Sequence, residues 1–268
     1  MVRFVGISIC GILLIVIGLG EFQRSAPPFS AGNYLETQYS GTVLRDNGDD
    51  SYRPPENIGT TYPIQVRGLY GYGLASSRIW RGFEAESDSP RPAIVLLHGA
   101  GRDGRSMLDM WQSVAKTADL HLIAPDASGG TGWSYANDGE NFVSAVLKSA
   151  MELYNIDTEQ IYLFGHSAGG AMAQHIANRT QGPWRVVATH AGFISAGDVK
   201  LNQQAAPFYM YLGDKDRRFS VPAARATAAA LAGAGHEVKL IVIPNHTHWF
   251  YKAGPAIAVQ IWDEIQAE

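Results

Sequence analysis

The chain has 268 residues, of which 46% are hydrophobic and 17% are charged, and its formal net charge is −4 at pH 7. A chain of this length buries a large core and usually forms one domain, with or without a small extension. No block of Lys and Arg runs along it, which argues against a nucleic-acid partner, and the charge balance is not acidic enough for disorder. The single cysteine, Cys10, excludes a disulfide framework within the body of the protein.

The first residues are typical of a targeting segment. Arg3 supplies a positive charge, residues 4–20 are almost wholly apolar, and Glu21 ends the run. Because runs this apolar are rare in soluble folds, the pattern predicts a signal peptide or an N-terminal membrane anchor over residues 1–26. A buried N-terminal helix is the alternative. We therefore expect an exported protein that is periplasmic, secreted or tethered to a membrane through this segment.

Residues 27–57 are polar and rich in Pro, Gly, Asn and Asp, which predicts a linker. The main domain is expected over residues 58–268. It opens with antiparallel strands within residues 61–85, because apolar residues alternate from Tyr62 onward as they do in a half-buried strand. A glycine-rich turn is expected at residues 70–73.

Strand and helix patterns alternate from residue 93 to the end of the chain. Short apolar runs predict buried strands, and apolar residues at helical spacing predict the helices between them. The predicted strands cover residues 93–97, 120–124, 161–164, 185–189, 208–212 and 238–243. The predicted helices cover residues 107–117, 142–154, 168–178, 222–231 and 257–266. This order predicts an α/β fold with a mostly parallel central sheet, helices on both faces and an antiparallel N-terminal edge, with the site beyond the carboxyl ends of the strands.

Ser167 is the strongest candidate for a catalytic residue. It lies in the sequence Gly-His-Ser-Ala-Gly-Gly (residues 165–170), between a predicted buried strand and a predicted helix. A serine on such a turn adopts a strained backbone, small neighbours permit the turn, and the hydroxyl is presented at a helix N-terminus. A plain glycine-rich turn is the alternative, but the flanking elements favour a nucleophile. We expect His166 to help shape the turn.

A second glycine-rich turn, His-Gly-Ala-Gly at residues 98–101, follows the first strand of the parallel series. A turn there can aim a backbone N–H at a developing oxyanion, and the start of the helix after Ser167 offers a second donor. We expect the N–H groups of Ala100 and Ala168 to form an oxyanion hole. An ordinary strand-end loop is the alternative interpretation of this turn.

A nucleophilic serine requires a histidine base and a carboxylate that orients the base. In strand–turn–helix serine enzymes the chain order is serine, acid, histidine, so both partners are sought downstream. Asp214 and Asp216 follow one of the last predicted strands. Either could serve, and Asp216 is favoured because it lies further into the loop. His246 and His248 follow the final strand, and of these we favour His248.

The histidine pair His246 and His248 has a competing interpretation as metal ligands. No cysteine or carboxylate lies at ligand spacing nearby, so we expect neither a metal nor another cofactor. Three aromatic residues, Trp133, Tyr135 and Trp249, lie on or beside the predicted site loops. We expect them to line a pocket for an acyl or aromatic group, with loop packing as the alternative.

Several of these segments resemble a known family. Residues 154–172, which contain Ser167, resemble the nucleophile region of the poly(3-hydroxybutyrate) depolymerase and feruloyl esterase group of α/β-hydrolases, and residues 97–101 resemble its oxyanion loop. Asp216, three residues after a glycine, matches the acid position of the group. His248, which precedes an aromatic run, is similar to the histidine loop of related esterases. The resemblance implies the α/β-hydrolase fold and favours Asp216 and His248 as triad members.

The resemblance also implies an activity, that of a serine esterase that cleaves carboxylic esters through an acyl-enzyme. Many secreted members of the group carry disulfides, which this chain cannot form, and we recognise no separate polymer-binding domain in the sequence. A small-molecule ester is therefore the expected partner. The alternatives are a serine peptidase or amidase with the same triad, and a non-catalytic, envelope-anchored binding module.

Overall fold

The computed structural model describes residues 30–41, 51–66, 76–129, 132–202 and 206–267. The apolar N-terminal segment with Cys10 and the turn expected at residues 70–73 lie outside these ranges. Within them, no helix combines the length and the apolar character that crossing a bilayer requires.

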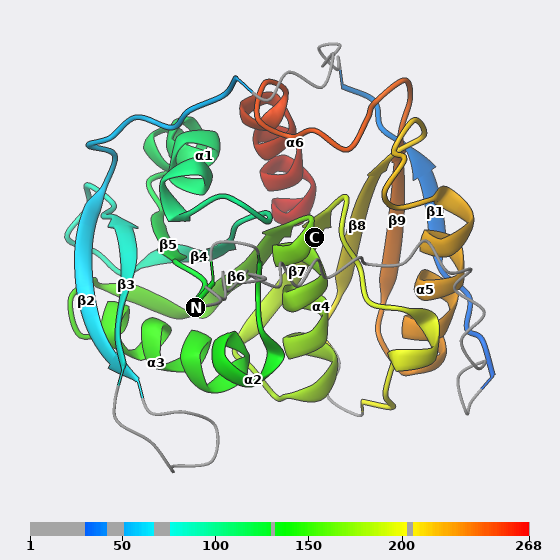
Figure 1. Ribbon diagram of the computed structural model, residues 1–268, viewed down its shortest axis with the longest axis horizontal. Helices are drawn as coiled ribbons and strands as arrows, with labels where there is room; N and C mark the ends of the chain where they lie inside the picture. The colour runs from blue at the N-terminus through cyan, green and yellow to red at the C-terminus, as the bar shows by residue number, and fades with distance from the viewer. Residues whose placement is uncertain (1–29, 42–50, 67–75, 130–131, 203–205, 268) are drawn as a thin grey trace, which may run out of the picture.

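One mixed sheet organises the described part of the chain (Figure 1). Its strands are β1 (Leu35–Gln38), β2 (Thr60–Val66), β3 (Ser76–Phe83), β4 (Arg91–Leu97), β5 (His121–Pro125), β6 (Ile156–His166), β7 (Trp184–His190), β8 (Phe208–Gly213) and β9 (Val238–Ile243). Their spatial order is β1-β9-β8-β7-β6-β4-β5-β3-β2. Neighbours from β1 to β5 are parallel, whereas β3 pairs antiparallel with both β5 and β2. The predicted fold class, including its antiparallel N-terminal edge, is confirmed.

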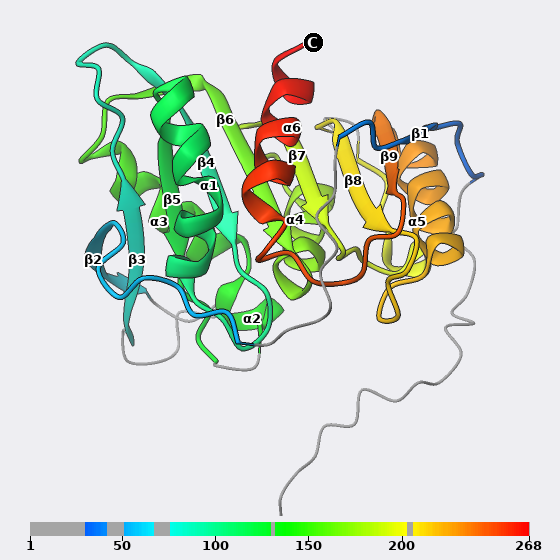
Figure 2. The same ribbon diagram turned by 90° about the horizontal axis from the view of Figure 1, so that it is seen from above.

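Helices cover both faces of this sheet. They are α1 (Gly104–Ala118), α2 (Tyr135–Asp138), α3 (Glu140–Met151), α4 (Ala168–Arg179), α5 (Val221–Gly233) and α6 (Gly254–Gln266), with a short 3₁₀ helix, η1 (Ala196–Asp198). Figures 1 and 2 show α1 and α6 on one face and α3, α4 and α5 on the other. The five longer helices were predicted, whereas α2 and η1 were not.

The strand β4 shows why its sequence is apolar without interruption. Ala93, Val95 and Leu97 belong to the core that α3, α4 and α5 cover, and Ile94 and Leu96 belong to the core under α1 and α6. All five are at most 1% exposed. Burial of each large aliphatic side chain stabilises the fold by about 1.5–3 kcal/mol. A strand covered on both faces therefore positions the loop that follows it rigidly.

The segment expected to be a linker, residues 27–57, contributes a strand, and this corrects the prediction. Residues 35–38 form β1, which pairs in parallel with β9 at the edge of the sheet. The outer strand is mostly exposed, so its sequence lacks the apolar alternation that reveals a half-buried strand. Glu36 binds the guanidinium of Arg225 with an N–O distance of 2.7 Å, which ties the strand to α5.

Candidate active site

Ser167 occupies a sharp turn between the end of β6 and the start of α4. Its backbone has φ 53° and ψ −118°, a left-handed φ that costs free energy in a residue with a side chain. The flanking glycines are sterically required. A Cβ on Gly165 would lie 2.2 Å from the Gly169 carbonyl oxygen, and one on Gly169 would lie 2.1 Å from the Leu97 carbonyl oxygen. The turn therefore has the strained geometry that the sequence motif predicts.

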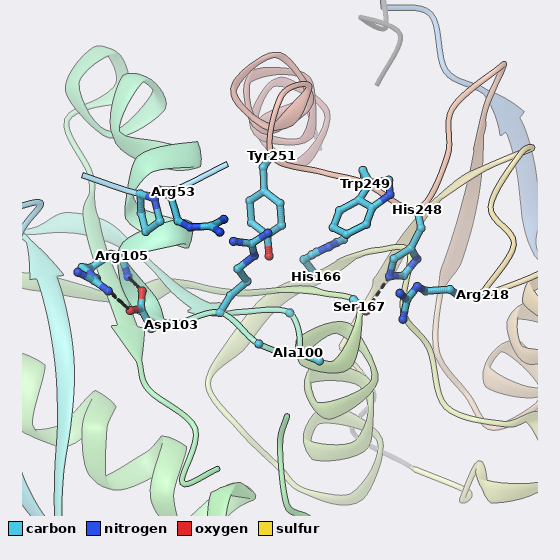
Figure 3. Close-up of a pocket in the computed structure, with 14 residues that line it drawn as sticks. Arg53, Ala100, Asp103, Arg105, His166, Ser167, Arg218, His248, Trp249 and Tyr251 are labelled. Carbon is cyan, nitrogen blue, oxygen red and sulfur yellow. Dashed lines mark hydrogen bonds and ion pairs between the residues drawn. The ribbon is translucent and has the colours of Figure 1, made fainter. Parts of the chain in front are cut away.

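The three residues favoured from the sequence form one hydrogen-bond chain. The Oγ of Ser167 lies 2.9 Å from Nε2 of His248 (Figure 3). Nδ1 of His248 lies 2.9 Å from Oδ2 of Asp216. The Asp216 side chain is 0% exposed and that of His248 is 10% exposed. Because an ionised carboxylate only accepts hydrogen bonds, Nδ1 carries the imidazole proton and Nε2 is left to accept the Ser167 proton.

The loop around Asp216 holds the carboxylate in place. Its Oδ1 accepts hydrogen bonds from the backbone N–H of Arg218 at 2.7 Å and of Phe219 at 2.9 Å. The Phe219 ring stacks on the His248 ring with centroids 5.7 Å apart and planes 13° apart. The orientation of the imidazole is thus fixed both by a charge and by an aromatic face.

The competing candidates point elsewhere. The Asp214 carboxylate lies 3.8 Å from the ammonium of Lys215, and its side chain is 35% exposed. Nε2 of His246 lies 2.8 Å from Nε2 of His190. Both ring nitrogens of His248 face other groups, Asp216 and Ser167.

The predicted oxyanion donors lie on loops that converge beside the nucleophile. A Cβ built on Gly132 would lie 3.8 Å from the Cβ of Ala168 and 3.9 Å from the Cβ of Ala100. Ala168 is the first residue of α4, where backbone N–H groups have no partner within the helix. Ala100 follows β4 and lines the same cavity as Ser167. This placement suits two backbone donors on one oxyanion.

Of the three predicted pocket aromatics, only Trp249 lines the cavity at Ser167. The Trp133 indole instead donates a hydrogen bond to the His98 carbonyl at 2.7 Å. It therefore fixes the loop that carries Ala100. Tyr135 is 53% exposed and stacks on His175, with ring centroids 3.9 Å apart. The described structure assigns both residues to loop packing, which was the alternative interpretation.

The cavity at Ser167 has a volume of about 570 Å³ and is strongly basic. Four arginines and a single carboxylate line it: Arg53, Arg102, Arg105, Arg218 and Asp103. Figure 3 shows Arg218 beside His248 and Arg53 towards the opposite end of the pocket. The chain as a whole has a net charge of −4, so the positive charge is concentrated at the site. Such a field attracts anionic groups.

The sequence did not reveal several of the pocket residues. The guanidinium of Arg102 lies over the Tyr251 ring, 4.7 Å from its centroid. Burial raises the pKa of Tyr251 to about 12. An arginine after a glycine-rich turn and a tyrosine in an aromatic run carry no distinctive signal. Among these pocket residues, Arg218 alone could have been suggested from the sequence, because it lies two residues after Asp216.

Comparisons with known proteins show sequence similarity to hydrolases. The model of the dienelactone hydrolase family matches residues 122–264, just over half of the chain. A bifunctional acetylxylan esterase/xylanase of Neocallimastix patriciarum is 31% identical over 98 residues. The matched region is 33% of this chain and 14% of that protein, so the chain corresponds to a small part of this relative.

Solved structures show the fold. The esterase PE8 superposes with a TM-score of 0.59 at 18% identity, covering 75% of this chain and 100% of that chain. A ferulic acid esterase superposes with a TM-score of 0.60 at 15% identity, covering 78% of this chain and 98% of that chain. At these identities the likeness shows the fold alone. The family match confirms the resemblance to α/β-hydrolases.

Proposed function

The chain belongs to the dienelactone hydrolase family of α/β-hydrolases, and from this premise we propose that it cleaves carboxylic esters with Ser167 as the nucleophile. The observation that carries the proposal is the continuous hydrogen-bond chain from Ser167 through His248 to Asp216, each step 2.9 Å long.

In the proposed reaction, Nε2 of His248 takes the Ser167 proton as Oγ attacks the acyl carbon. The carbonyl electrons move to the oxygen, and the tetrahedral intermediate collapses when His248 donates this proton to the leaving alcohol. Water, deprotonated by His248, then attacks the acyl carbon. The second tetrahedral intermediate releases the acid as His248 donates the water proton to Oγ of Ser167. Asp216 keeps the imidazole in the tautomer that accepts at Nε2 and stabilises the imidazolium that forms.

The oxyanion is proposed to bind the N–H groups of Ala100 and Ala168. Removal of one such donor typically costs about 3–4 kcal/mol of transition-state stabilisation. His98 holds the backbone that carries Ala100. Its Nδ1 lies 2.9 Å from the Gly99 carbonyl oxygen, and its Nε2 accepts a hydrogen bond from the Ala127 N–H at 3.1 Å. Burial lowers the pKa of His98, which keeps this bridge neutral.

We propose a small-molecule ester as the substrate. The cavity volume of about 570 Å³ lies within the range of roughly 300–1,000 Å³ that small-molecule sites occupy. Trp249 at its wall supplies an apolar surface for the acyl or alcohol group. The relative's xylan-directed name belongs to a much longer protein, so it does not define the substrate here.

Hydrolysis assays on the full chain test the proposal. Wild type should hydrolyse p-nitrophenyl acetate and act far more slowly on peptide anilides, whereas the reverse order would favour a peptidase. Ser167→Ala should lower kcat/KM by at least roughly 10⁴-fold because the nucleophile is lost. Ser89→Ala, which changes an exposed loop serine, is the matched control and should keep wild-type kinetics. Absence of ester hydrolysis by folded wild type would contradict the proposal.

A further inference from the structure

Three buried histidines outside the triad form a chain of imidazoles behind the nucleophile. Nδ1 of His166 lies 3.0 Å from Nδ1 of His190, and Nε2 of His190 lies 2.8 Å from Nε2 of His246. Their exposed fractions are 3%, 0% and 1%. Buried polar rings are costly unless they are paired, and the mechanism above uses none of the three.

The three imidazoles join the segments that carry the site. His166 directly precedes Ser167, and His190 ends β7, where its carbonyl accepts the Ser167 N–H at 2.9 Å. His246 lies two residues before His248, and its carbonyl accepts the Lys215 N–H at 2.9 Å in the acid loop. The three imidazoles therefore connect the segments that carry the nucleophile, the base and the acid.

The surrounding acceptors fix which nitrogen of His166 carries a proton. Its Nδ1 faces both Nδ1 of His190 at 3.0 Å and the His190 carbonyl oxygen at 3.3 Å. A carbonyl only accepts, so a proton on Nδ1 of His166 gains that contact, whereas a lone pair there would face the oxygen's lone pairs. Burial holds the pKa of His166 and His190 well below the usual range, so each ring is neutral. Nε2 of His166 is then unprotonated.

This acceptor nitrogen belongs to a residue in the wall of the substrate cavity. His166 lines the cavity together with Ser167 and Tyr251, and Figure 3 shows it between them. A Cβ on Gly99 would lie 3.0 Å from Cδ2 of His166 and 3.5 Å from its Nε2. The absence of a side chain at Gly99 thus leaves this edge of the imidazole uncovered on that side.

We propose that Nε2 of His166 is a hydrogen-bond acceptor for the substrate, and that the preferred esters carry a free hydroxyl within a few bonds of the ester group, as a partly acylated polyol does. The His166 and His248 rings have centroids only 5.4 Å apart, which places the donor close to the reacting atoms. His190 and His246 are positioning residues that keep the acceptor tautomer. The inference rests on the proposed esterase function.

A matched set of esters tests the recognition step. The full chain is assayed with 2,3-dihydroxypropyl acetate, 2,3-dimethoxypropyl acetate and propyl acetate, of which only the first donates hydrogen bonds. Wild type should favour the dihydroxy ester in kcat/KM by about 2- to 10-fold, the range that one neutral hydrogen bond supports. His166→Phe should bring the ratios close to one. His166→Gln, whose amide oxygen accepts, should restore part of the preference.

A spectroscopic measurement on wild type does not depend on whether the variants fold. ¹⁵N-histidine labelling with two-bond ¹H–¹⁵N correlations distinguishes the two neutral tautomers and the imidazolium, and His166→Gln assigns the signal. The expected result is a proton on Nδ1 of His166 at neutral pH and an unprotonated Nε2. A proton on Nε2 would overturn the inference.

The outcomes separate the two proposals. Wild type that hydrolyses none of the three acetates contradicts the esterase function itself. Wild type that hydrolyses the dihydroxy and dimethoxy esters equally well is an esterase without this acceptor, and the inference alone fails. A dihydroxy preference that survives intact in His166→Phe also overturns it, because the donor is then recognised elsewhere.

Discussion

The carboxylate of Asp216 lies 2.9 Å from Nδ1 of His248, although 32 positions separate the two residues in the chain. The contact is partly buried, and the other carboxylate oxygen accepts hydrogen bonds from two backbone N–H groups. Asp216→Asn should therefore lower kcat by roughly 10³- to 10⁴-fold, because an amide can stabilise the wrong imidazole tautomer. Ester hydrolysis kinetics measure the effect.

The matched control for this change is Asp214→Asn. Asp214 lies two residues away in the same loop, and its carboxylate contacts only Lys215 among the ion pairs of the described residues. Asp214→Asn should keep kcat within about twofold of wild type, since exposed ion pairs contribute little to stability. Equal losses in the two variants would refute the assignment of Asp216.

The glycines of the nucleophile turn should tolerate no side chain. A Cβ on Gly169 would lie 2.1 Å from the Leu97 carbonyl oxygen, which is backbone and cannot rotate away. Gly169→Ala should lower the free energy of unfolding by about 1–3 kcal/mol, or more, and should displace the Ser167 hydroxyl. Urea unfolding and ester hydrolysis report the two effects.

Gly129→Ala is the control for this substitution. A Cβ there meets only the Gly132 carbonyl oxygen, at 3.9 Å, which is an ordinary contact. Its unfolding midpoint should match wild type. Should Gly169→Ala prove equally stable and active, the steric account of the turn would be wrong.

The basic cavity should select substrates by charge. Arg218 lines the cavity near His248, so Arg218→Gln should lower kcat/KM for an ester bearing a carboxylate by about 3- to 10-fold and change a neutral ester by less than about twofold. The difference should shrink at high salt because ions screen exposed charges. Arg217→Gln, an exposed neighbour outside the cavity lining, is the control and should discriminate no differently from wild type.

The buried histidines should make the protein sensitive to acid. The pKa of His166 and of His190 is held well below its usual value by burial, whereas both return to about 6.5 in the unfolded chain. Below about pH 6.5 the unfolded state binds more protons, so the free energy of unfolding falls as pH falls, by up to about 1.4 kcal/mol per pH unit for each histidine. Urea unfolding between about pH 7.5 and 5.5 measures the slope. A stability that is flat or rises toward acid would contradict this.

The parallel sheet was predictable because its strands are buried on both faces. A run such as Ile94 to Leu97 has no polar interruption, and the helices between such runs have one apolar stripe. The edge strand over residues 35–38 was not predictable. Its side chains face solvent, and its pairing with β9 depends on a partner some 200 residues away.

The triad could be proposed from the sequence because motif, chain order and loop position all constrain it. Of the three pocket aromatics proposed from the sequence, only Trp249 lines the cavity. Trp133 and Tyr135 follow a glycine-rich loop, but their partners, the His98 carbonyl and the His175 ring, come from distant segments. The basic lining could not be predicted either, because only the fold brings Arg53 and Arg218 to one cavity. Long-range proximity of this kind leaves no local pattern.

Labelling with a fluorophosphonate tests the central claim most directly, because the reagent phosphonylates only a serine whose hydroxyl is activated. We expect one adduct per chain, located by peptide mass spectrometry on Ser167, and no adduct in folded Ser167→Ala. A folded wild type that hydrolyses esters but carries no adduct, or carries it on another residue, would contradict the account.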